Sequence, residues 1–247
     1  ALVTGASRGI GAAIAQGLAK EGVCVWKVLR KAPLLGDESC VIADLLVEED
    51  LKSVEAWIER EKPDLLINAA GSGDCLGSLE RSVEAWETEW KLNYEAPRRL
   101  NLAMARACSE KGVLVNVSSM VVDYPQPYLA SYNATKAALS ALSESLSDEF
   151  PRLRFIDLRP GDIRTQFADK WSLLSQENPA YATQAHLKAC LKRAPKPEVV
   201  ADTLIKALRQ KRQGVVYAGS FFESVLGRIA KKVLPSGILR AARRGLF

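Results

Sequence analysis

The sequence predicts an α/β fold in which a doubly wound (Rossmann), mostly parallel sheet of about seven strands lies between two layers of helices. Short apolar runs alternate with helical patterns along the chain, and most of these runs are apolar at consecutive positions. Consecutive apolar residues are typical of strands that are covered on both faces, and the alternation implies right-handed crossovers. The length of 247 residues is compatible with a single domain of this three-layer type.

The strands and the clearest helices follow from these patterns. Strands are expected at residues 1–4, 23–28, 40–43, 64–68, 112–118, 153–158 and 214–218. Helices are expected at residues 10–20, 51–61, 82–108, 132–150 and 197–211. Pro97 should kink the long third helix, because proline lacks the backbone donor and clashes with the preceding turn. The single domain is expected at residues 1–219, and its longest strand-free segment, 162–195, is expected to form a lid over the carboxyl ends of the strands.

Several classes of protein are disfavoured by composition. No run of about 18 apolar residues predicts a membrane span, and no signal-peptide pattern precedes the first strand. The five widely spaced cysteines form no CxxC pair, so neither a disulfide framework nor a zinc site is expected, and a reducing, cytoplasmic location is favoured. The single histidine, His186, cannot supply a multi-histidine site, so no metal is expected.

The net charge of +5 comes from the end of the chain. Residues 228–247 hold six basic residues and no acid, and removing those six charges leaves a body of −1, which disfavours a nucleic-acid partner. From Phe221 onward, apolar pairs recur every four residues, so residues 220–247 are predicted to form a basic amphipathic tail. Such a tail docks on its own body or a sister subunit, or it lies on an anionic membrane surface, and both alternatives stay open.

A glycine-rich segment connects the first predicted strand to the first predicted helix. It reads Thr4-Gly5-Ala6-Ser7-Arg8-Gly9-Ile10-Gly11. Glycines at this position allow a tight turn and let backbone N–H groups approach a pyrophosphate at the helix N-terminus. The spacing is G-xxx-G-x-G, which indicates a dinucleotide site only in this strand-to-helix context; a plain turn is the alternative.

Tyr132 and Lys136 lie four residues apart on a predicted helix and therefore share one face. A free phenol has a pKa of about 10, and a neighbouring ammonium group is expected to lower it toward neutrality. Ser119, at the end of a predicted strand, could donate a hydrogen bond to a reacting oxygen. Any one of these residues alone would more often be a solvent-exposed side chain without a catalytic role.

Together these segments resemble the short-chain dehydrogenase/reductase family. Asn68-Ala69-Ala70-Gly71 resembles the family's NAG motif, and Asn93 falls where the family has its active-site asparagine. Tyr132 to Lys136 matches the YxxxK motif, and Ser119 precedes Tyr132 by the family's usual thirteen residues, which favours it over Ser118. Pro160-Gly161 followed by Thr165 matches the PGxxxT segment, so the resemblance spans about residues 1–218.

The resemblance implies a role for each residue of the tetrad. Tyr132 would be the general acid in reduction, Lys136 would also bind the nicotinamide ribose, Ser119 would polarise the carbonyl, and Asn93 would hold a water in the proton relay. The residues implied to contact the cofactor are Gly5, Ser7, Arg8, Gly9, Ile10, Gly11, Arg30, Asp44, Leu45, Asn68, Ala69, Gly71, Tyr132, Lys136, Pro160, Gly161, Ile163 and Thr165.

The end of the second predicted strand favours NADP(H) over NAD(H). NAD enzymes carry an acidic residue there that binds the ribose hydroxyls. The resemblance aligns Leu29 with that position, and Arg30 and Lys31 follow directly, while Arg8 lies in the glycine loop. Two arginines without a carboxylate suit a 2′-phosphate. Solvated loop charges are the alternative reading of Arg30 and Lys31.

The leading hypothesis is therefore a carbonyl reductase or ketoreductase acting on a small molecule as a homodimer or homotetramer. An alcohol dehydrogenase working in the oxidative direction, and a cofactor-sensing or scaffold protein, are the alternatives. The predicted lid is apolar at Phe167, Trp171, Leu173 and Leu174, as is the stretch 125–129. This pattern indicates a hydrophobic or acyl substrate, or simply packing within the lid.

Overall fold

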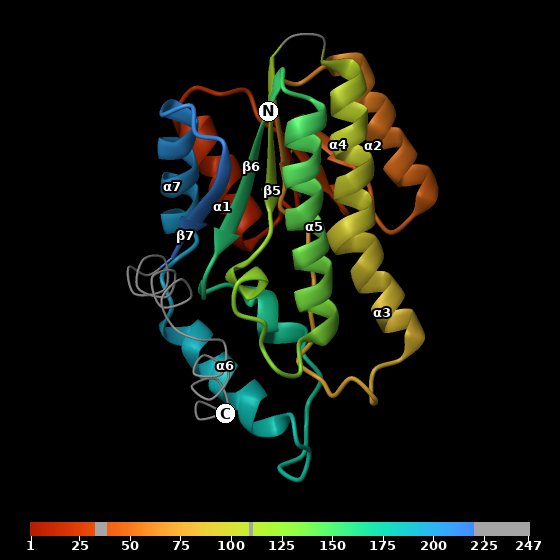
Figure 1. Cartoon of the computed structure of the whole chain (residues 1–247), viewed down its shortest axis with the longest axis vertical. Coiled ribbons are helices and arrows are strands. Elements are labelled where there is room, and N and C mark those ends of the chain that lie inside the picture. The colour runs from red at the N-terminus through yellow and green to blue at the C-terminus, as the bar shows by residue number, and fades with distance from the viewer. Residues whose placement is uncertain (33–38, 109–110, 220–247) are drawn as a thin grey trace.

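The strands of the described residues form one parallel sheet in the order β3-β2-β1-β4-β5-β6-β7 (Figure 1). They are β1 (Leu2–Thr4), β2 (Trp26–Leu29), β3 (Cys40–Ile42), β4 (Leu65–Asn68), β5 (Gly112–Val117), β6 (Leu153–Pro160) and β7 (Gly214–Ala218). This computed structural model describes residues 1–32, 39–108 and 111–219, so the predicted tail lies outside the described residues. The predicted seven-stranded doubly wound sheet is confirmed.

The strand order reverses between β1 and β4. From β1 the chain moves outward to β3, then returns across the sheet to β4 and moves outward the other way to β7. The loops that follow β1 and β4 consequently diverge at the carboxyl ends of two neighbouring strands. In open α/β sheets, this point is where ligands bind.

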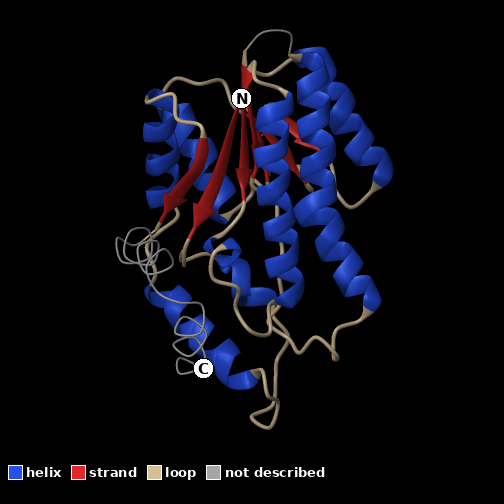
Figure 2. Cartoon of the chain, viewed as in Figure 1, coloured by secondary structure: helices blue, strands red, loops and turns tan. Residues whose placement is uncertain are grey.

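Helices cover both faces of the sheet (Figure 2). The helical elements are α1 (Gly9–Lys20), α2 (Glu48–Glu61), α3 (Val83–Trp90), η1 (Lys91–Glu95), α4 (Ala96–Ala107), η2 (Met120–Val122), α5 (Ala130–Glu149), η3 (Gln166–Lys170), α6 (Tyr181–Arg193) and α7 (Glu198–Arg209). One apolar core lies between the sheet and α1 with α7, and a second lies between the sheet and α2, α4 and α5.

Neighbouring strand residues alternate between these two cores. Leu66 and Leu114 belong to the core under α2 and α4, whereas Ile67 and Val115 belong to the core under α1 and α7, and all four are fully buried. Because the central strands β4 and β5 are buried on both faces, their apolar residues run consecutively instead of alternating with polar ones. This pattern is the physical basis of the correct sheet prediction.

The long third helix of the prediction is interrupted. The α-helix stops at Trp90, a π-helical turn spans Lys91–Glu95, and α4 then begins with Pro97 in its first turn. Pro97 has no N–H to give, so the wider turn before it absorbs the lost hydrogen bond. A π-helical turn thus stands directly before Pro97, where the kink was expected, and this turn contains Asn93.

The segment 162–195 contains two elements that the pattern analysis did not identify, η3 and the thirteen-residue helix α6. Figure 1 shows α6 beyond the carboxyl ends of the strands, away from both helical layers. Here a third apolar cluster joins Trp171 and Leu187 to Cys75 and Leu129. α6 was missed because only Thr183, Gln184 and Leu187 of its residues are buried, too few for a clear apolar stripe.

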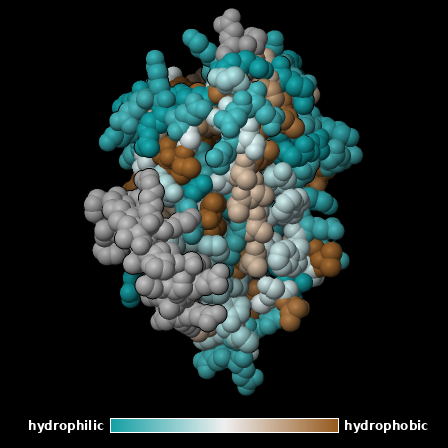
Figure 3. Space-filling model, in the orientation of Figure 1, coloured by the Kyte–Doolittle hydropathy of each residue, from teal (hydrophilic) through white to brown (hydrophobic). Residues whose placement is uncertain are grey.

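The surface of the described residues is mostly polar. The face drawn in Figure 3 is largely hydrophilic, and its apolar residues occur in small separate spots. Leu79 and Leu173 are the most exposed large apolar residues, at 103% and 95%. In the described part of the chain, no helix combines the length and the apolar composition that crossing a bilayer requires.

Two glycines with positive φ, Gly5 and Gly22, test whether the turn after β1 needs a glycine because of its close contact with Ala70 or because of its backbone conformation alone. Gly5 has a φ of +65°, and a Cβ there would lie 2.7 Å from the backbone of Ala70. Gly22 has a φ of +80°, with nothing within 4 Å of a Cβ. We expect Gly22→Ala to cost about 1 kcal/mol from backbone strain alone. Gly5→Ala should cost at least about twice as much, because β1 and β4 must also move apart.

The free energy of unfolding of both variants, measured by denaturant titration, checks this prediction. Equal losses in the two variants would mean that the close approach of Gly5 to Ala70 is not a constraint on the fold.

Candidate active site

The glycine loop holds the start of α1 against the end of β1. Gly9 has a φ of +58°, and a Cβ on Gly11 would lie 2.4 Å from the carbonyl oxygen of Gly5. Arg8, the residue before α1, is extended and exposed, and the first turn of α1 contains no acidic residue. The free N–H groups of a helix start and the absence of a carboxylate suit an anion. The residues present therefore fit the pyrophosphate of a dinucleotide.

Thr4 connects the glycine loop to the segment after β4. Its hydroxyl oxygen accepts hydrogen bonds from the N–H groups of Ala69 and Ala70, both at 3.1 Å. Thr4 is buried, so these bonds satisfy two backbone donors that the sheet no longer pairs. Sequence reasoning did not identify this contact, although Thr4 stands directly before Gly5. These hydrogen bonds hold the loop after β1 to the loop after β4, at the point where the strand order reverses.

The Asn68 side chain is part of a buried hydrogen-bond network, and its predicted contact with the cofactor stays a prediction. Its Nδ2 donates to Oδ1 of Asn101 and of Asn116, both at 2.8 Å, and Asn116 in turn donates to the Ser143 hydroxyl at 2.8 Å. These side chains are buried. A network of this kind ties β4 and β5 to α4 and α5 and gives the sheet end a fixed geometry. The Asn68 side chain thus stabilises the carboxyl end of β4 through buried hydrogen bonds.

Tyr132 and Lys136 lie one turn apart on α5, as the spacing predicted. The Lys136 Nζ lies 5.8 Å from the centre of the Tyr132 ring and donates to the Val117 carbonyl at 2.8 Å. Burial lowers the pKa of Lys136 to about 8, and Asp157 and Glu89 oppose that shift.

The pKa of Tyr132 moves against the sequence-based expectation. Burial raises the pKa of Tyr132 to about 12, and a hydrogen bond with Ser119 only partly offsets this. The spacing of Tyr132 and Lys136 predicted a lowered pKa, and that expectation is wrong for the protein by itself. The cost of removing the phenolate from water outweighs the attraction of the ammonium group, which faces the Val117 carbonyl.

The two serines after β5 have different surroundings. Ser118 is buried, and its hydroxyl donates to the Asp157 carboxylate below the sheet end. Ser119 is half-buried and begins η2, where its oxygen accepts from the N–H of Val121 at 3.2 Å. Of these two serines, Ser119 is the one that forms a hydrogen bond with Tyr132. The geometry therefore favours the serine that the thirteen-residue spacing selected.

Asn93 is fully buried and uses its whole amide group. The Oδ1 accepts from the N–H of Ser72 at 2.9 Å, and the Nδ2 donates to the Ser72 carbonyl at 2.8 Å and to the Thr135 hydroxyl at 3.1 Å. The side chain therefore joins the loop after β4 to the turn of α5 that lies between Tyr132 and Lys136. A water-holding role for Asn93 stays a prediction.

Aromatic residues cover the Tyr132 side of the site. The Phe167 ring lies 5.3 Å from the Tyr132 ring and 6.0 Å from the Trp171 ring. The Trp171 indole N–H donates to the Gly73 carbonyl at 2.8 Å, and Ser172 donates to Asp74 through both its N–H and its hydroxyl. The segment 162–195 is therefore fastened across the loop that follows β4. Phe167 and Trp171 were identified from the sequence; their contacts with Gly73 were not.

The residues after β6 approach the glycine loop from the other side. The N–H of Gly161 donates to Ala218 at 2.8 Å, and Ile163 is buried in the core under α1. A Cβ on Gly9 would lie 3.3 Å from the Thr165 methyl group. Thr165 thus lies next to Gly9 of the glycine loop, as expected if both residues contact the same cofactor.

The residues predicted for the adenosine end lie beside β2 and β3. Arg30 and Lys31 are exposed at the carboxyl end of β2, and no acidic side chain ends that strand, because Leu29 is its last residue. Asp44 follows β3, and its carboxylate accepts from the N–H of Leu46 at 3.0 Å. Leu45 is buried. These positions are compatible with the predicted cofactor contacts, which stay predictions.

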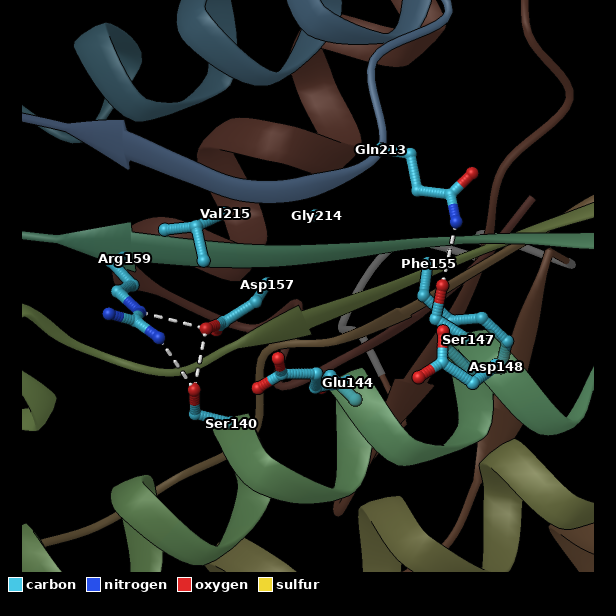
Figure 4. A pocket seen from close by; sticks show the side chains of 11 residues that line it. Ser140, Glu144, Ser147, Asp148, Phe155, Asp157, Arg159, Gln213, Gly214 and Val215 are labelled. Atoms are coloured by element: carbon cyan, nitrogen blue, oxygen red, sulfur yellow. Dashed lines mark hydrogen bonds and ion pairs between the residues drawn. The ribbon is translucent and has the colours of Figure 1, made fainter.

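A separate polar pocket of about 290 Å³ lies between α5, β6 and β7 (Figure 4). Arg159 lines it and donates to Asp157 at 2.8 Å and to the Ser140 hydroxyl at 2.7 Å. These groups satisfy one another, and the residues that line the pocket do not include Ser119, Tyr132 or Lys136. It is not part of the candidate site.

Comparisons with known proteins agree with this arrangement. A family model described as short chain dehydrogenase matches residues 1–174. Dehydrogenase/reductase SDR family member 11 of Mus musculus is 33% identical over 238 residues, which cover 84% of this chain and 87% of that protein. The fold and the site define a dinucleotide-binding oxidoreductase, and the chain belongs to the short-chain dehydrogenase family.

Solved structures share the fold over nearly the whole chain. A short-chain dehydrogenase from Streptomyces avermitilis has a TM-score of 0.80 at 27% identity, covering 99% of this chain and 96% of its own. A short-chain dehydrogenase from Sphingobium yanoikuyae in complex with NADPH has a TM-score of 0.71 at 26% identity, covering 99% and 93%. The predicted family and the predicted fold are both confirmed.

The contrast between the two serines leads to a prediction. Ser119→Ala should lower kcat by about 100-fold or more, because the group facing the Tyr132 hydroxyl is lost. Ser118→Ala should leave kcat within a few-fold but lower the free energy of unfolding by about 1–3 kcal/mol, because Asp157 loses a buried partner. Steady-state kinetics and denaturant titration of both variants separate these effects. Equal kinetic losses would contradict the distinction.

Proposed function

We propose that this protein is an NADP(H)-dependent carbonyl reductase or ketoreductase that uses Ser119, Tyr132 and Lys136. The observation that carries the proposal is that these three side chains meet beside the segment after β4, which Gly5 of the glycine loop also contacts. Membership of the short-chain dehydrogenase family supports oxidoreductase chemistry. The choice of cofactor, the direction and the substrate rest on the residues of this chain.

The residues would divide the chemistry as follows. The nicotinamide cofactor supplies the hydride when it is bound. Tyr132 donates the proton to the carbonyl oxygen, and the Ser119 hydroxyl orients and polarises that oxygen. Lys136 binds the nicotinamide ribose, and its charge stabilises the phenolate after the proton has left. Asn93 keeps Ser72 and Thr135 in register, so that the loop and α5 do not shift during turnover.

The ionisation of Tyr132 favours the reductive direction. A phenol whose pKa is raised to about 12 is fully protonated at neutral pH and has a proton to give. An alcohol dehydrogenase needs the phenolate as base, which this environment disfavours until a bound cofactor changes the balance. Reduction is therefore the function we favour, with alcohol oxidation as the alternative. A purely cofactor-sensing or scaffold role is disfavoured, because no member of the tetrad is replaced.

NADPH is the proposed cofactor because of the charges after β2. Leu29 ends the strand where a carboxylate would repel a 2′-phosphate, and the exposed Arg30 and Lys31 follow it. Arg8 lies in the glycine loop and is also exposed. The Sphingobium yanoikuyae structure contains NADPH, which is compatible with this choice.

The proposed substrate is apolar next to its carbonyl group, because the Phe167 ring lies against the Tyr132 ring. We propose that the segment 162–195 acts as a lid, fastened by Trp171 and Ser172 to the loop after β4. A homodimer or homotetramer and a cytoplasmic location are also proposed. Peripheral membrane contact or internal docking through residues 220–247 stays a prediction, since that tail lies outside the described residues.

The acid role of Tyr132 has a direct test. Tyr132→Phe should lower kcat at least tenfold, and by the 10²–10⁴-fold that is typical of lost proton transfer, while the affinity for NADPH changes little. The reason is that only the phenolic proton is removed. Steady-state rates and NADPH binding by fluorescence measure the two effects. Tyr94→Phe, at a ring that packs on Trp90, is the matched control and should stay active. A Tyr132→Phe variant that keeps more than about a tenth of the rate would remove Tyr132 as the acid.

The cofactor preference has a second test. Wild-type protein should prefer NADPH over NADH in kcat/KM, and Arg30→Asp should narrow or reverse this preference, because a carboxylate repels the 2′-phosphate. Lys111→Asp makes the same charge change at the opposite end of the sheet, just before β5, and should leave the ratio unchanged. Equal efficiency with both cofactors in the unmutated protein would contradict the NADPH assignment.

A further inference from the structure

A buried carboxylate lies beside Tyr132 and has no part in the tetrad. Glu89, on α3, is only 2% exposed, although it sits one turn before Asn93 in a segment that faces solvent elsewhere. Burying a carboxylate costs several kcal/mol unless charge and hydrogen bonds offset it. A residue held at such a cost next to a reacting group calls for a physical role.

Arg81 holds the Glu89 carboxylate in place. The guanidinium group donates to the Oε2 of Glu89, and the side chains of Arg81 and Glu89 are 8% and 2% exposed. Arg81 also donates to the carbonyl of Asp74 at 3.2 Å, and Asp74 accepts from Ser172 of the proposed lid. One charged pair therefore connects α3 to the loop after β4 and to the segment that covers Tyr132.

The second oxygen of Glu89 faces Tyr132 across Gly73. A Cβ on Gly73 would lie 2.8 Å from the Cδ2 of Tyr132, 2.9 Å from the Cζ of Phe167 and 3.1 Å from the Oε1 of Glu89. The carboxylate oxygen and the Tyr132 ring thus approach the same point from two sides, within about 6 Å of each other. A Cβ at position 73 would overlap the rings of Tyr132 and Phe167 and press on the Glu89 carboxylate, so glycine is the residue that allows this close approach.

The charged groups around Tyr132 come from several elements. Lys136 lies on α5 itself, the Glu89–Arg81 pair comes from α3 and the loop before it, and Asp162 comes from the segment after β6. Glu89 and Asp162 both raise the pKa of Tyr132, and burial of Asp162 raises the pKa of that carboxyl group in turn. Burial raises the pKa of Glu89, and the interactions with Ser131 and Arg81 oppose that rise, so the pairing with Arg81 favours the ionised carboxylate.

We propose that Glu89 is a positioning residue for the reaction of Tyr132, with its Arg81-held carboxylate setting the negative charge that the phenol faces. The charge opposes loss of the Tyr132 proton and so keeps the phenol in its acid form. This inference rests on the proposed function, in which Tyr132 is the proton donor. It adds a residue pair that tunes the donor and ties it to the lid without touching the substrate.

The sign of the charge gives the test. Glu89→Gln keeps the shape, removes the negative charge and leaves Arg81 unpaired, so Tyr132 should ionise at lower pH. Arg81→Gln leaves Glu89 uncompensated, so Tyr132 should ionise at higher pH. The alkaline limb of the pH profile of carbonyl reduction, which requires protonated Tyr132, should move in these opposite directions. Each shift should be on the order of half a pH unit or more, the effect of one charge at this separation even with water-like screening.

Glu89→Asp is the matched control, because it keeps the charge and should keep the midpoint of the wild-type profile. A lower plateau with an unmoved midpoint in both Gln variants would overturn the proposal, since a merely structural pair changes the amount of active protein and not the ionisation. Failure of both variants to fold, seen by circular dichroism, would overturn it as well.

A second readout keeps this inference separate from the proposed function. NMR of the labelled tyrosine ring carbons follows ionisation without any substrate, and the Tyr132 signal is identified by its loss in Tyr132→Phe. We expect Tyr132 to ionise at the lowest pH in Glu89→Gln and at the highest in Arg81→Gln. The same order without turnover would support the role of Glu89 while the reductase assignment fails. Indistinguishable titrations with normal turnover would remove Glu89 and leave the reductase assignment intact.

Discussion

The buried ammonium group of Lys136 is the constraint on which the site depends. It is 4% exposed, and its hydrogen bond to the Val117 carbonyl fixes α5 against the end of β5. A charged group in such a place must be held by neighbours or lose its proton, and burial indeed lowers the pKa of Lys136 to about 8. Tyr132 lies one turn earlier on α5, so the Lys136 hydrogen bond also fixes the position of Tyr132. Ser119 is the second residue after β5 and lies at the same end of the sheet. The buried position of the Lys136 ammonium group therefore helps to determine where Tyr132 and Ser119 lie.

Around this anchor, buried polar contacts join loops that are far apart in the sequence. The Thr4 hydroxyl holds the backbone after β4, and Asn93 holds Ser72 and Thr135. Arg81 extends the same system to Asp74 and so to the proposed lid. Each contact satisfies donors or acceptors that the sheet leaves unpaired at its carboxyl edge. Rigidity of the site and satisfaction of the backbone are thus achieved by the same side chains.

Local patterns predicted the features that depend on local periodicity. Consecutive apolar residues revealed strands buried on both faces, and the spacing of Tyr132 and Lys136 placed both on one face of α5. Features that depend on contacts between distant segments were not predictable. Glu89 reads as an ordinary surface acid of α3, and only the fold brings it to Gly73 and Tyr132. The sign of the Tyr132 pKa shift failed for the same reason, because burial is a property of the assembled site.

The site is proposed to transfer hydride from NADPH to a carbonyl group. The most direct measurement is the consumption of NADPH and of NADH by the wild-type protein, followed by absorbance, with a panel of aldehydes, ketones and 3-oxoacyl thioesters. We expect at least one apolar carbonyl compound to consume NADPH, with one alcohol formed per cofactor oxidised and slower consumption of NADH. No consumption of either cofactor across the panel, by folded protein that binds NADPH, would contradict the account.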